Sequence, residues 1–228
     1  MEATGVCSPT VASPDKISIT LQLKSRSGGL PCSNALAPFV IAALVALGPL
    51  PAGAQNNAAP PPPAIADKVQ LCATCHGADG LPVVEKVPII AGQHKYNLLT
   101  VLKEFRDGAR ASDIMGPIAK NLSGDDMNAL AAYFSALPWP AYREPADAAS
   151  ITRVQALDAW AKCSSCHPKG FVGSASTPRV ANQKLDYLIK TLSDFHDNKR
   201  SNSRAMAALV RNWSADDIAA MAHYLAGL

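Results

Sequence analysis

Two copies of the pentapeptide Cys-x-x-Cys-His, at residues 72–76 and 163–167, are the part of this sequence best suited to chemistry. This pentapeptide is the attachment sequence of c-type haem. Its two thiols form thioether bonds with the haem vinyl groups, and its histidine becomes an axial ligand of the iron. The sequence therefore predicts two covalently bound haem c groups, with thioethers from Cys72, Cys75, Cys163 and Cys166 and proximal ligation by His76 and His167.

A methionine follows each motif at the same distance. Met115 lies 39 positions after His76, and Met206 lies 39 positions after His167. The thioether sulfur of methionine pairs with histidine on the iron of many c-type cytochromes. We therefore expect Met115 and Met206 to be the sixth ligands of the two irons.

Cysteine pairs of this spacing also occur in zinc sites and in redox-active dithiols. Two pairs could supply the four thiolates of a tetrahedral zinc shell, but about ninety residues separate them here, far more than is usual in zinc motifs. A zinc shell also has no need of the histidine that follows each pair. A redox dithiol is disfavoured because nothing around either pair indicates a βαβ scaffold. The haem interpretation is therefore preferred.

An export signal is expected, because haem attachment of this kind needs an extracytoplasmic compartment. Residues 35–47 form a short apolar run, and Ala52-Gly53-Ala54 is an A-x-A cleavage pattern. We predict that residues 1–54 are a signal peptide cleaved after Ala54, which places the mature protein in the periplasm. An uncleaved membrane anchor is the alternative, but the run is shorter than the roughly 20 residues that span a bilayer. The proline-rich residues 55–63 are expected to be a disordered lead-in.

The rest of the sequence is a duplicated domain. Adding 91 to a position carries the first motif onto the second and Met115 onto Met206. Between motif and methionine the offset is 90, as for Pro88 and Pro178, so a deletion and an insertion cancel. Such repetition indicates two similar units in tandem. We predict a first domain at residues 64–137, a proline-marked linker at 138–150 and a second domain at 151–228.

Each copy is predicted to be all-helical. One helix leads into the motif, at about residues 64–75 and 151–166, and the methionine is expected on an irregular segment further on. Met127 and Met221 fall at apolar helical positions and are predicted core residues. A middle helix has an apolar stripe at helical spacing, and a last helix starts with a serine cap. The stripe is Leu98, Leu102 and Phe105, matched by Leu188, Leu192 and Phe195, and the caps are Ser123 with Asp126 and Ser214 with Asp217.

Two further pairs of residues match between the copies. Pro88 and Pro178 could each present a backbone carbonyl to the free ring nitrogen of the proximal histidine, which would orient the imidazole and strengthen it as a ligand. An ordinary turn proline is the alternative. Arg110 and Arg200 could pair with haem propionates or cap the middle helix, and the residues alone leave both roles open. The histidines without a match are expected to have surface or structural roles: His94, His196 and His223.

The charge balance of the chain is only mildly basic. The full chain has 21 Lys and Arg against 18 Asp and Glu, and removal of residues 1–54 leaves 18 against 16. Haem propionates would largely cancel the remaining excess. Nucleic-acid binding needs a concentrated basic patch, so no nucleic-acid partner is expected.

Taken together, these features resemble the two-haem cytochrome c4 family of tandem class I cytochromes c. The resemblance rests on the two motifs, on the methionines ahead of the Ser-x-Asp-Asp helix starts, and on Ala91-Gly92-Gln93 matched by Ala181-Asn182-Gln183. It covers residues 64–228. It implies an all-α fold in which each domain wraps a few helices around one covalent haem c. It also implies a periplasmic electron carrier, not an enzyme, that works between a respiratory donor and a terminal oxidase or reductase.

Two other functions are compatible with parts of this pattern. Tandem class I cytochromes also serve as subunits docked on periplasmic dehydrogenases, and the proline-rich lead-in could tether such a subunit or give peripheral membrane association. A two-haem peroxidase is disfavoured, because it needs an accessible coordination site while both motifs have a methionine in register. We expect positive reduction potentials for both couples, since a methionine ligand and burial both favour ferrous iron.

Overall fold

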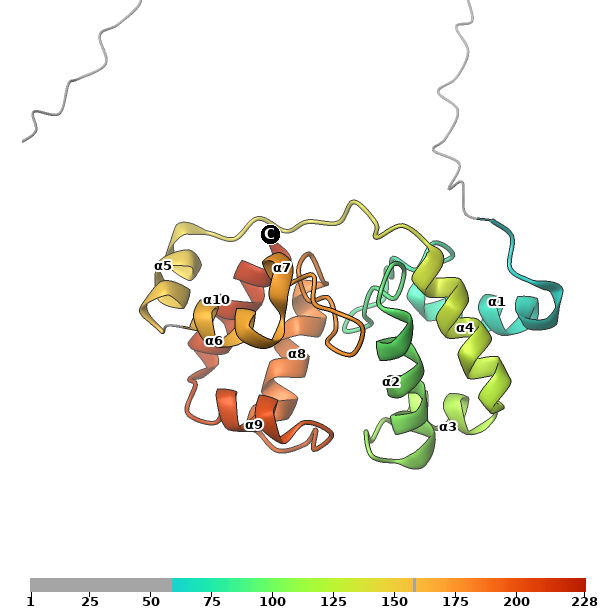
Figure 1. Cartoon of the computed structure of the whole chain (residues 1–228). Coiled ribbons are helices and arrows are strands. Elements are labelled where there is room, and N and C mark those ends of the chain that lie inside the picture. Colours follow the sequence, from blue (N-terminus) through green and yellow to red (C-terminus); the bar gives the residue numbers. More distant parts are fainter. Residues whose placement is uncertain (1–58, 158) are drawn as a thin grey trace, which may run out of the picture. The chain divides into compact units, whose positions relative to one another are not determined.

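The computed structural model describes residues 59–157 and 159–228, and within these ranges it contains helices and irregular segments but no strand (Figure 1). The all-α prediction is confirmed. The expected signal peptide and residues 55–58 of the lead-in lie outside the described residues. The first copy consists of the 3-10 turn η1 (Pro63–Ile65) and helices α1 (Ala66–His76), α2 (Lys95–Asp107), α3 (Met115–Lys120) and α4 (Gly124–Ala136). The second consists of α5 (Ala148–Ala156), α6 (Ala159–Cys166), α7 (Pro168–Phe171), α8 (Leu185–His196), α9 (Arg204–Val210) and α10 (Ala215–Ala226).

Each copy has its own hydrophobic core, in which the middle helix packs against the last helix. In the first copy α2 packs against α4, and in the second α8 packs against α10. The predicted stripes face these cores, with Phe105 and Phe195 both buried. Met127 and Met221 are 0 % and 1 % exposed, which confirms that both are core residues. Among the described helices, none is long and apolar enough to cross a membrane.

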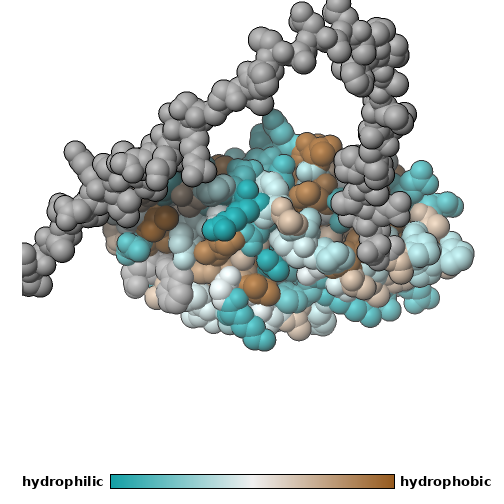
Figure 2. Space-filling model, turned by 90° about the horizontal axis from the view of Figure 1, so that it is seen from above, coloured by the Kyte–Doolittle hydropathy of each residue, from teal (hydrophilic) through white to brown (hydrophobic). Residues whose placement is uncertain are grey.

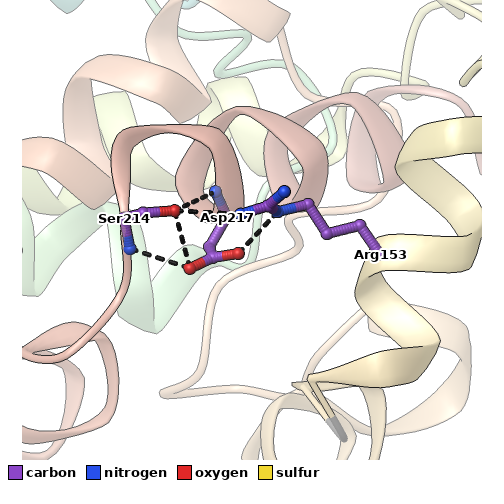
Figure 3. A network of polar contacts seen from close by, with 3 residues as sticks. All are labelled: Arg153, Ser214 and Asp217. Atoms are coloured by element: carbon purple, nitrogen blue, oxygen red, sulfur yellow. Dashed lines mark hydrogen bonds and ion pairs between the residues drawn. The ribbon is translucent and has the colours of Figure 1, made fainter.

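The predicted serine caps at the last helix are present in both copies as reciprocal capping boxes. Ser123 Oγ accepts from Asp126 N at 3.1 Å, and Asp126 Oδ2 accepts from Ser123 N at 3.0 Å. The same exchange joins Ser214 and Asp217, at 3.2 and 2.8 Å (Figure 3). Each box satisfies backbone N–H groups that have no partner inside the helix, and places a carboxylate at the positive end of the helix dipole.

The prediction of an irregular segment around the methionines is wrong. Met115 is the first residue of α3, and Met206 lies within α9. A serine three residues before each methionine accepts a hydrogen bond from the methionine N–H, Ser112 at 3.0 Å and Ser203 at 3.3 Å. Serine in this position favours a helix start. Pro117 is tolerated because it lies in the first turn of α3, where the N–H groups have no intrahelical partner.

The prediction of a single helix at residues 151–166 is also wrong. Asp147 caps α5, because its side chain accepts from Ser150 N at 2.7 Å, so the helix begins at Ala148 and not at residue 151. The helix ends at Ala156, and the N–H of the next residue, Leu157, donates to Arg153 O at 3.0 Å. Both cysteines of the second motif lie on the separate short helix α6. In the first copy the helix that leads into the motif is unbroken from Ala66 to His76.

The segment between α4 and α5 is irregular and lies against both copies (Figure 1). Gly92 has a φ of +64°, and a Cβ there would lie 2.7 Å from Trp139 N, so glycine lets this segment approach the first copy closely. On the second copy, Arg143 Nε donates to Gly227 O at 2.7 Å. The Arg179 guanidinium lies 4.4 Å from the Trp139 ring centre. The segment is therefore packed against the two cores that it connects.

Candidate haem sites

Each Cys-x-x-Cys-His motif lies at the end of a helix. The first occupies the last turn of α1, and the second occupies the last turn of α6 and the residue after it. Residues three and four apart lie on one face of a helix, so the thiols and the imidazole of the first motif share one side, as do the two thiols of the second motif. The cysteines of the described residues are all free thiols: Cys72, Cys75, Cys163 and Cys166.

The thiols do not form a zinc site or resemble a reactive dithiol. Burial raises the pKa of the Cys72 thiol and raises that of Cys163 to about 11. Both thiols are therefore protonated at neutral pH, whereas reactive dithiols depend on thiolates of lowered pKa. Within residues 59–157 and 159–228, no three His, Cys, Asp or Glu side chains converge as a metal-binding group. The two cysteine pairs are thus not combined into one tetrahedral shell.

Both motif histidines are held by a proline carbonyl, as predicted from the sequence. His76 Nδ1 lies 2.9 Å from Pro88 O, and His167 Nδ1 lies 2.9 Å from Pro178 O. A carbonyl can only accept, so Nδ1 carries the proton and Nε2 keeps the lone pair that binds a metal. Both residues are 8 % exposed. Burial lowers the pKa of each, against the opposing effect of the proline carbonyl, and so favours the neutral imidazole that iron requires.

The matched methionines lie on the same cores as the attachment cysteines. Met115 and Cys72 both pack against the first core, and Met206 and Cys163 both pack against the second. All four side chains are partly buried among apolar neighbours. Two thiols, an imidazole and a thioether on an apolar core are the donor set that suits a haem c. Axial ligation by the methionines stays a prediction.

Arg110 and Arg200 do not cap the middle helices with their side chains. Their backbone N–H groups bond to carbonyls in the last turns of α2 and α8, at 3.1 and 2.9 Å. The guanidinium groups lie over phenylalanine rings, 4.6 Å from the ring centre of Phe105 for Arg110 and 4.4 Å from that of Phe195 for Arg200. Capping is thus performed by the backbone, and the side chain of Arg200 instead donates from Nε to Asn202 Oδ1 at 2.8 Å.

A tyrosine of the second copy lies between these two arginines. Arg110 Nη2 donates to Tyr187 Oη at 3.1 Å. Desolvation of this hydroxyl opposes its ionisation, but the charges of Arg110 and Arg200 lower the pKa of Tyr187 to about 7. Burial and the charge of Arg110 together lower the pKa of Arg200. The negative charge of Glu104 acts on Arg200 in the opposite direction and raises this pKa. Pairing of either arginine with haem propionates stays a prediction.

Gln93 and Gln183 were not among the predicted site residues, yet both lie where the two copies meet. They are 6 % and 3 % exposed. The amide of Gln183 bonds to the backbone of Ile89, and the amide of Gln93 bonds to the backbone of Arg179. Their signal in the sequence was a polar residue matched in both copies just before an amphipathic helix.

Two family models match the chain in tandem. The model described as "Cytochrome c" matches residues 64–138. The model described as "Cytochrome C oxidase, cbb3-type, subunit III" matches residues 150–225. Each copy of the repeat is therefore similar to a c-type cytochrome domain on its own.

Longer similarities extend over both copies. A thiosulfate dehydrogenase electron acceptor from Stutzerimonas stutzeri is 35 % identical, over 69 % of this chain and 78 % of that protein. A cytochrome c4 from Pseudomonas aeruginosa is 32 % identical, over 71 % of this chain and 85 % of that protein. The crystal structure of reduced recombinant cytochrome c4 from Pseudomonas stutzeri has a TM-score of 0.65 at 30 % identity, over 71 % of this chain and 95 % of that one. Each of these matches is too long to lie within one copy, so the similarity includes both copies.

Proposed function

The chain belongs to the two-haem cytochrome c4 family, and from this premise we propose that it carries electrons in the periplasm through two irons that are each bound by histidine and methionine. It is an electron carrier of two tandem class I cytochrome c domains with two covalent haem c groups. The observation that carries the ligand assignment is the 2.9 Å contact between histidine Nδ1 and a proline carbonyl, which occurs in both copies. It leaves Nε2 of each histidine free for iron.

The proposed ligands divide into two equal sets. Each bound haem supplies a one-electron ferric/ferrous couple. With a histidine and a methionine to hold each iron, no substrate would have to reach the metal, and the thioether would favour the ferrous state. In the first domain, proposed at residues 64–137, the set is Cys72, Cys75, His76 and Met115. In the second, proposed at residues 148–228 so that α5 is included whole, it is Cys163, Cys166, His167 and Met206.

Periplasmic location and removal of residues 1–54 form part of the proposal. The short apolar run and the A-x-A pattern at residues 52–54 support export and cleavage. The attachment motifs support it as well, because c-type haem is attached outside the cytoplasm. The predicted mature protein begins at Gln55, and its mass equals that of residues 55–228 plus two haems. Intact-mass measurement of the purified protein tests the cleavage site and the attachment of two haems together.

The surface suits brief contacts with redox proteins. Several large apolar side chains are exposed, with Val83 at 93 %, Ile114 at 68 % and Tyr96 at 60 %. On the face shown in Figure 2, hydrophobic residues are interspersed among hydrophilic ones. Transient redox complexes bury less than about 1,200 Å² in total, and small apolar areas of this kind are enough for them. This favours a diffusing carrier between a respiratory donor and a terminal oxidase or reductase.

A second candidate is an electron-accepting subunit docked on a periplasmic dehydrogenase. The relative from Stutzerimonas stutzeri supports it, since that protein is named as the electron acceptor of a dehydrogenase. The chemistry of this chain is the same in both cases. What differs is the length of time that it stays bound to its donor.

Size-exclusion chromatography of a gently prepared native extract separates the two candidates. Periplasmic and membrane fractions are run separately, and covalent haem is detected on the chain. A single small species in the periplasmic fraction supports the diffusing carrier. Elution with a much larger protein supports the dehydrogenase subunit. Recovery from the membrane fraction by salt alone indicates peripheral association, and failure to find covalent haem on the chain contradicts both candidates.

A further inference from the structure

Where the two copies meet, each extends a buried glutamine amide to the backbone of the other. Gln183 Oε1 accepts from Ile89 N at 2.8 Å, and Gln183 Nε2 donates to Ile89 O at 3.0 Å. Gln93 makes the same pair with Arg179, in which Oε1 accepts from N at 2.9 Å and Nε2 donates to O at 3.0 Å. A side-chain amide that bonds both backbone groups of one residue holds it as a neighbouring β-strand would.

Both glutamines are firmly anchored in their own copy. Gln93 Oε1 also accepts from His94 N at 3.0 Å, and Gln183 Oε1 from Lys184 N at 2.9 Å, at the starts of α2 and α8. The preceding residue has a left-handed conformation in both copies, with φ of +64° at Gly92 and +56° at Asn182. Asparagine adopts this conformation more readily than most residues, which explains the Gly/Asn exchange. The orientation of each amide is thus fixed by the backbone at the start of the helix that follows it.

The residues that the glutamines hold are adjacent to the prolines that hold the histidines. Ile89 N–H and Pro88 C=O belong to one planar peptide group. His76 binds the carbonyl end of this group at 2.9 Å, and Gln183 binds its N–H end at 2.8 Å. The peptide group that orients His76 is therefore hydrogen-bonded at both ends, and one of those bonds comes from the other copy.

The second copy repeats this arrangement with the roles of the copies exchanged. The peptide group between Pro178 and Arg179 binds His167 through its carbonyl at 2.9 Å. Gln93 of the first copy binds its N–H at 2.9 Å. Each proximal histidine is thus connected, through one peptide group, to a buried glutamine of the opposite copy.

We propose that Gln183 and Gln93 are positioning residues that tune the iron of the opposite copy. Hydrogen bonds in a chain polarise one another, so a peptide whose N–H is bonded has a stronger acceptor at its carbonyl. A stronger bond to Nδ1–H makes the imidazole a more basic ligand, and a more basic ligand favours ferric iron. Each glutamine therefore lowers the reduction potential of the haem in the other copy. This rests on the proposed ligation by His76 and His167.

The test compares Gln183→Met and Gln93→Met in the full haem-loaded protein. Methionine keeps the approximate volume of glutamine but lacks its amide. Potentiometric titration of Gln183→Met is expected to show a positive shift of the first couple with the second unchanged, and Gln93→Met the reverse. The couples are assigned with Met115→His and Met206→His, each of which displaces its own couple. A shift in the copy that bears the substitution, or equal shifts of both couples, overturns the proposal.

A matched control removes a different hydrogen bond between the copies. Asp186 Oδ2 of the second copy accepts from Lys86 N of the first copy at 2.6 Å, in the same loop as the Pro88–Ile89 peptide group but without a bond to it. Asp186→Ala is expected to leave the two potentials unchanged relative to each other. If it produces the same selective shift as Gln183→Met, the effect comes from a loosened contact between the copies, and the positioning role is refuted.

A second readout does not depend on the iron. Hydrogen exchange of the Ile89 amide is expected to accelerate in Gln183→Met while that of Arg179 stays slow, and Gln93→Met is expected to do the opposite. Rapid exchange of both amides in the unsubstituted protein would refute the glutamine contacts themselves. Slow, selectively perturbed exchange in a protein whose spectrum lacks histidine–methionine ligation would instead locate the failure in the proposed ligands.

Discussion

The two copies share the parts that would hold a haem, but they secure the start of the last helix differently. In the second copy, Arg153 of α5 bonds to both members of the capping box, with Nε 2.6 Å from Asp217 Oδ1 and Nη2 3.1 Å from Ser214 Oγ (Figure 3). In the first copy, Lys68 of α1 reaches only the carboxylate, with Nζ 3.0 Å from Asp126 Oδ1. A guanidinium can bond two acceptors in a fixed geometry, whereas an ammonium acts as a point charge.

The surfaces of the copies differ as well. Leu71, Tyr96 and Ile114 of the first copy are 52 %, 60 % and 68 % exposed. The matched positions of the second copy carry a lysine, an aspartate and an alanine: Lys162, Asp186 and Ala205. The duplication thus kept the residues of the haem sites and changed exposed positions, which leaves larger apolar side chains on the surface of the first copy.

The largest expected effect is on the reduction potentials of Met115→His and Met206→His. Replacing a thioether by a second imidazole removes the preference for ferrous iron, so the potential of the altered haem should fall by tenths of a volt, within the span of about 0.8 V that axial ligands impose. Potentiometric titration should show one low couple in each variant and the other couple unmoved. A clearly negative couple in the unsubstituted protein would contradict histidine–methionine ligation of both irons.

Truncation of the core methionines should lower the free energy of unfolding by about the same amount in either copy. Met127 and Met221 are 0 % and 1 % exposed, so replacing either by alanine removes buried contacts and leaves a cavity. The expected loss is about 2–5 kcal/mol for each variant, measured by denaturant unfolding of the haem-loaded protein. The exposed Lys103→Ala serves as the control. A loss confined to one copy would show that the two cores are not equivalent.

Removal of the capping serines should lower the stability of the protein by a smaller amount, and by a different amount in each copy. Loss of a serine cap costs about 1 kcal/mol, so Ser123→Ala and Ser214→Ala should both destabilise. The effect of Ser214→Ala should be the larger, because Arg153 loses an acceptor together with the cap. Thermal unfolding of the two variants gives the ranking. Equal effects, or the reverse order, would mean that Arg153 does not stabilise the start of α10.

The smallest expected effect is a pH dependence at the capping carboxylates. Hydrogen bonds from the serine N–H lower the pKa of Asp217, as they do for Asp126. A carboxyl whose pKa is depressed by folding stabilises the protein above its unfolded pKa, near 4, and loses this contribution as the pH falls further. Asp217→Asn should therefore lose less stability than the unsubstituted protein on acidification below about pH 4. Denaturant unfolding of both proteins over a series of acidic pH values measures the difference, and parallel losses of stability would contradict a contribution from the Asp217 carboxylate.

Several local features were predictable from the residues alone. The capping boxes, the stripes of α2 and α8 and the bond between each motif histidine and its proline were all predicted, because each depends on short spacings or on a repeat that shows which residues match. The errors also have local causes. The capping bonds of Ser203 and Asp147 and the bond from Met115 N to Ser112 Oγ were overlooked, so the helices at the two methionines and the early start of α5 were missed.

The sequence by itself determined the cofactor chemistry, since thiols and imidazole in a fixed pentapeptide specify covalent haem wherever the chain folds. It also determined the duplication and the helical character of both copies, because periodicity and caps act within a few residues. Only the tertiary structure decided what Gln93, Gln183 and Arg110 contact. Their partners lie in the opposite copy, and nothing in the residues near a side chain specifies which distant backbone or side-chain group will be packed beside it.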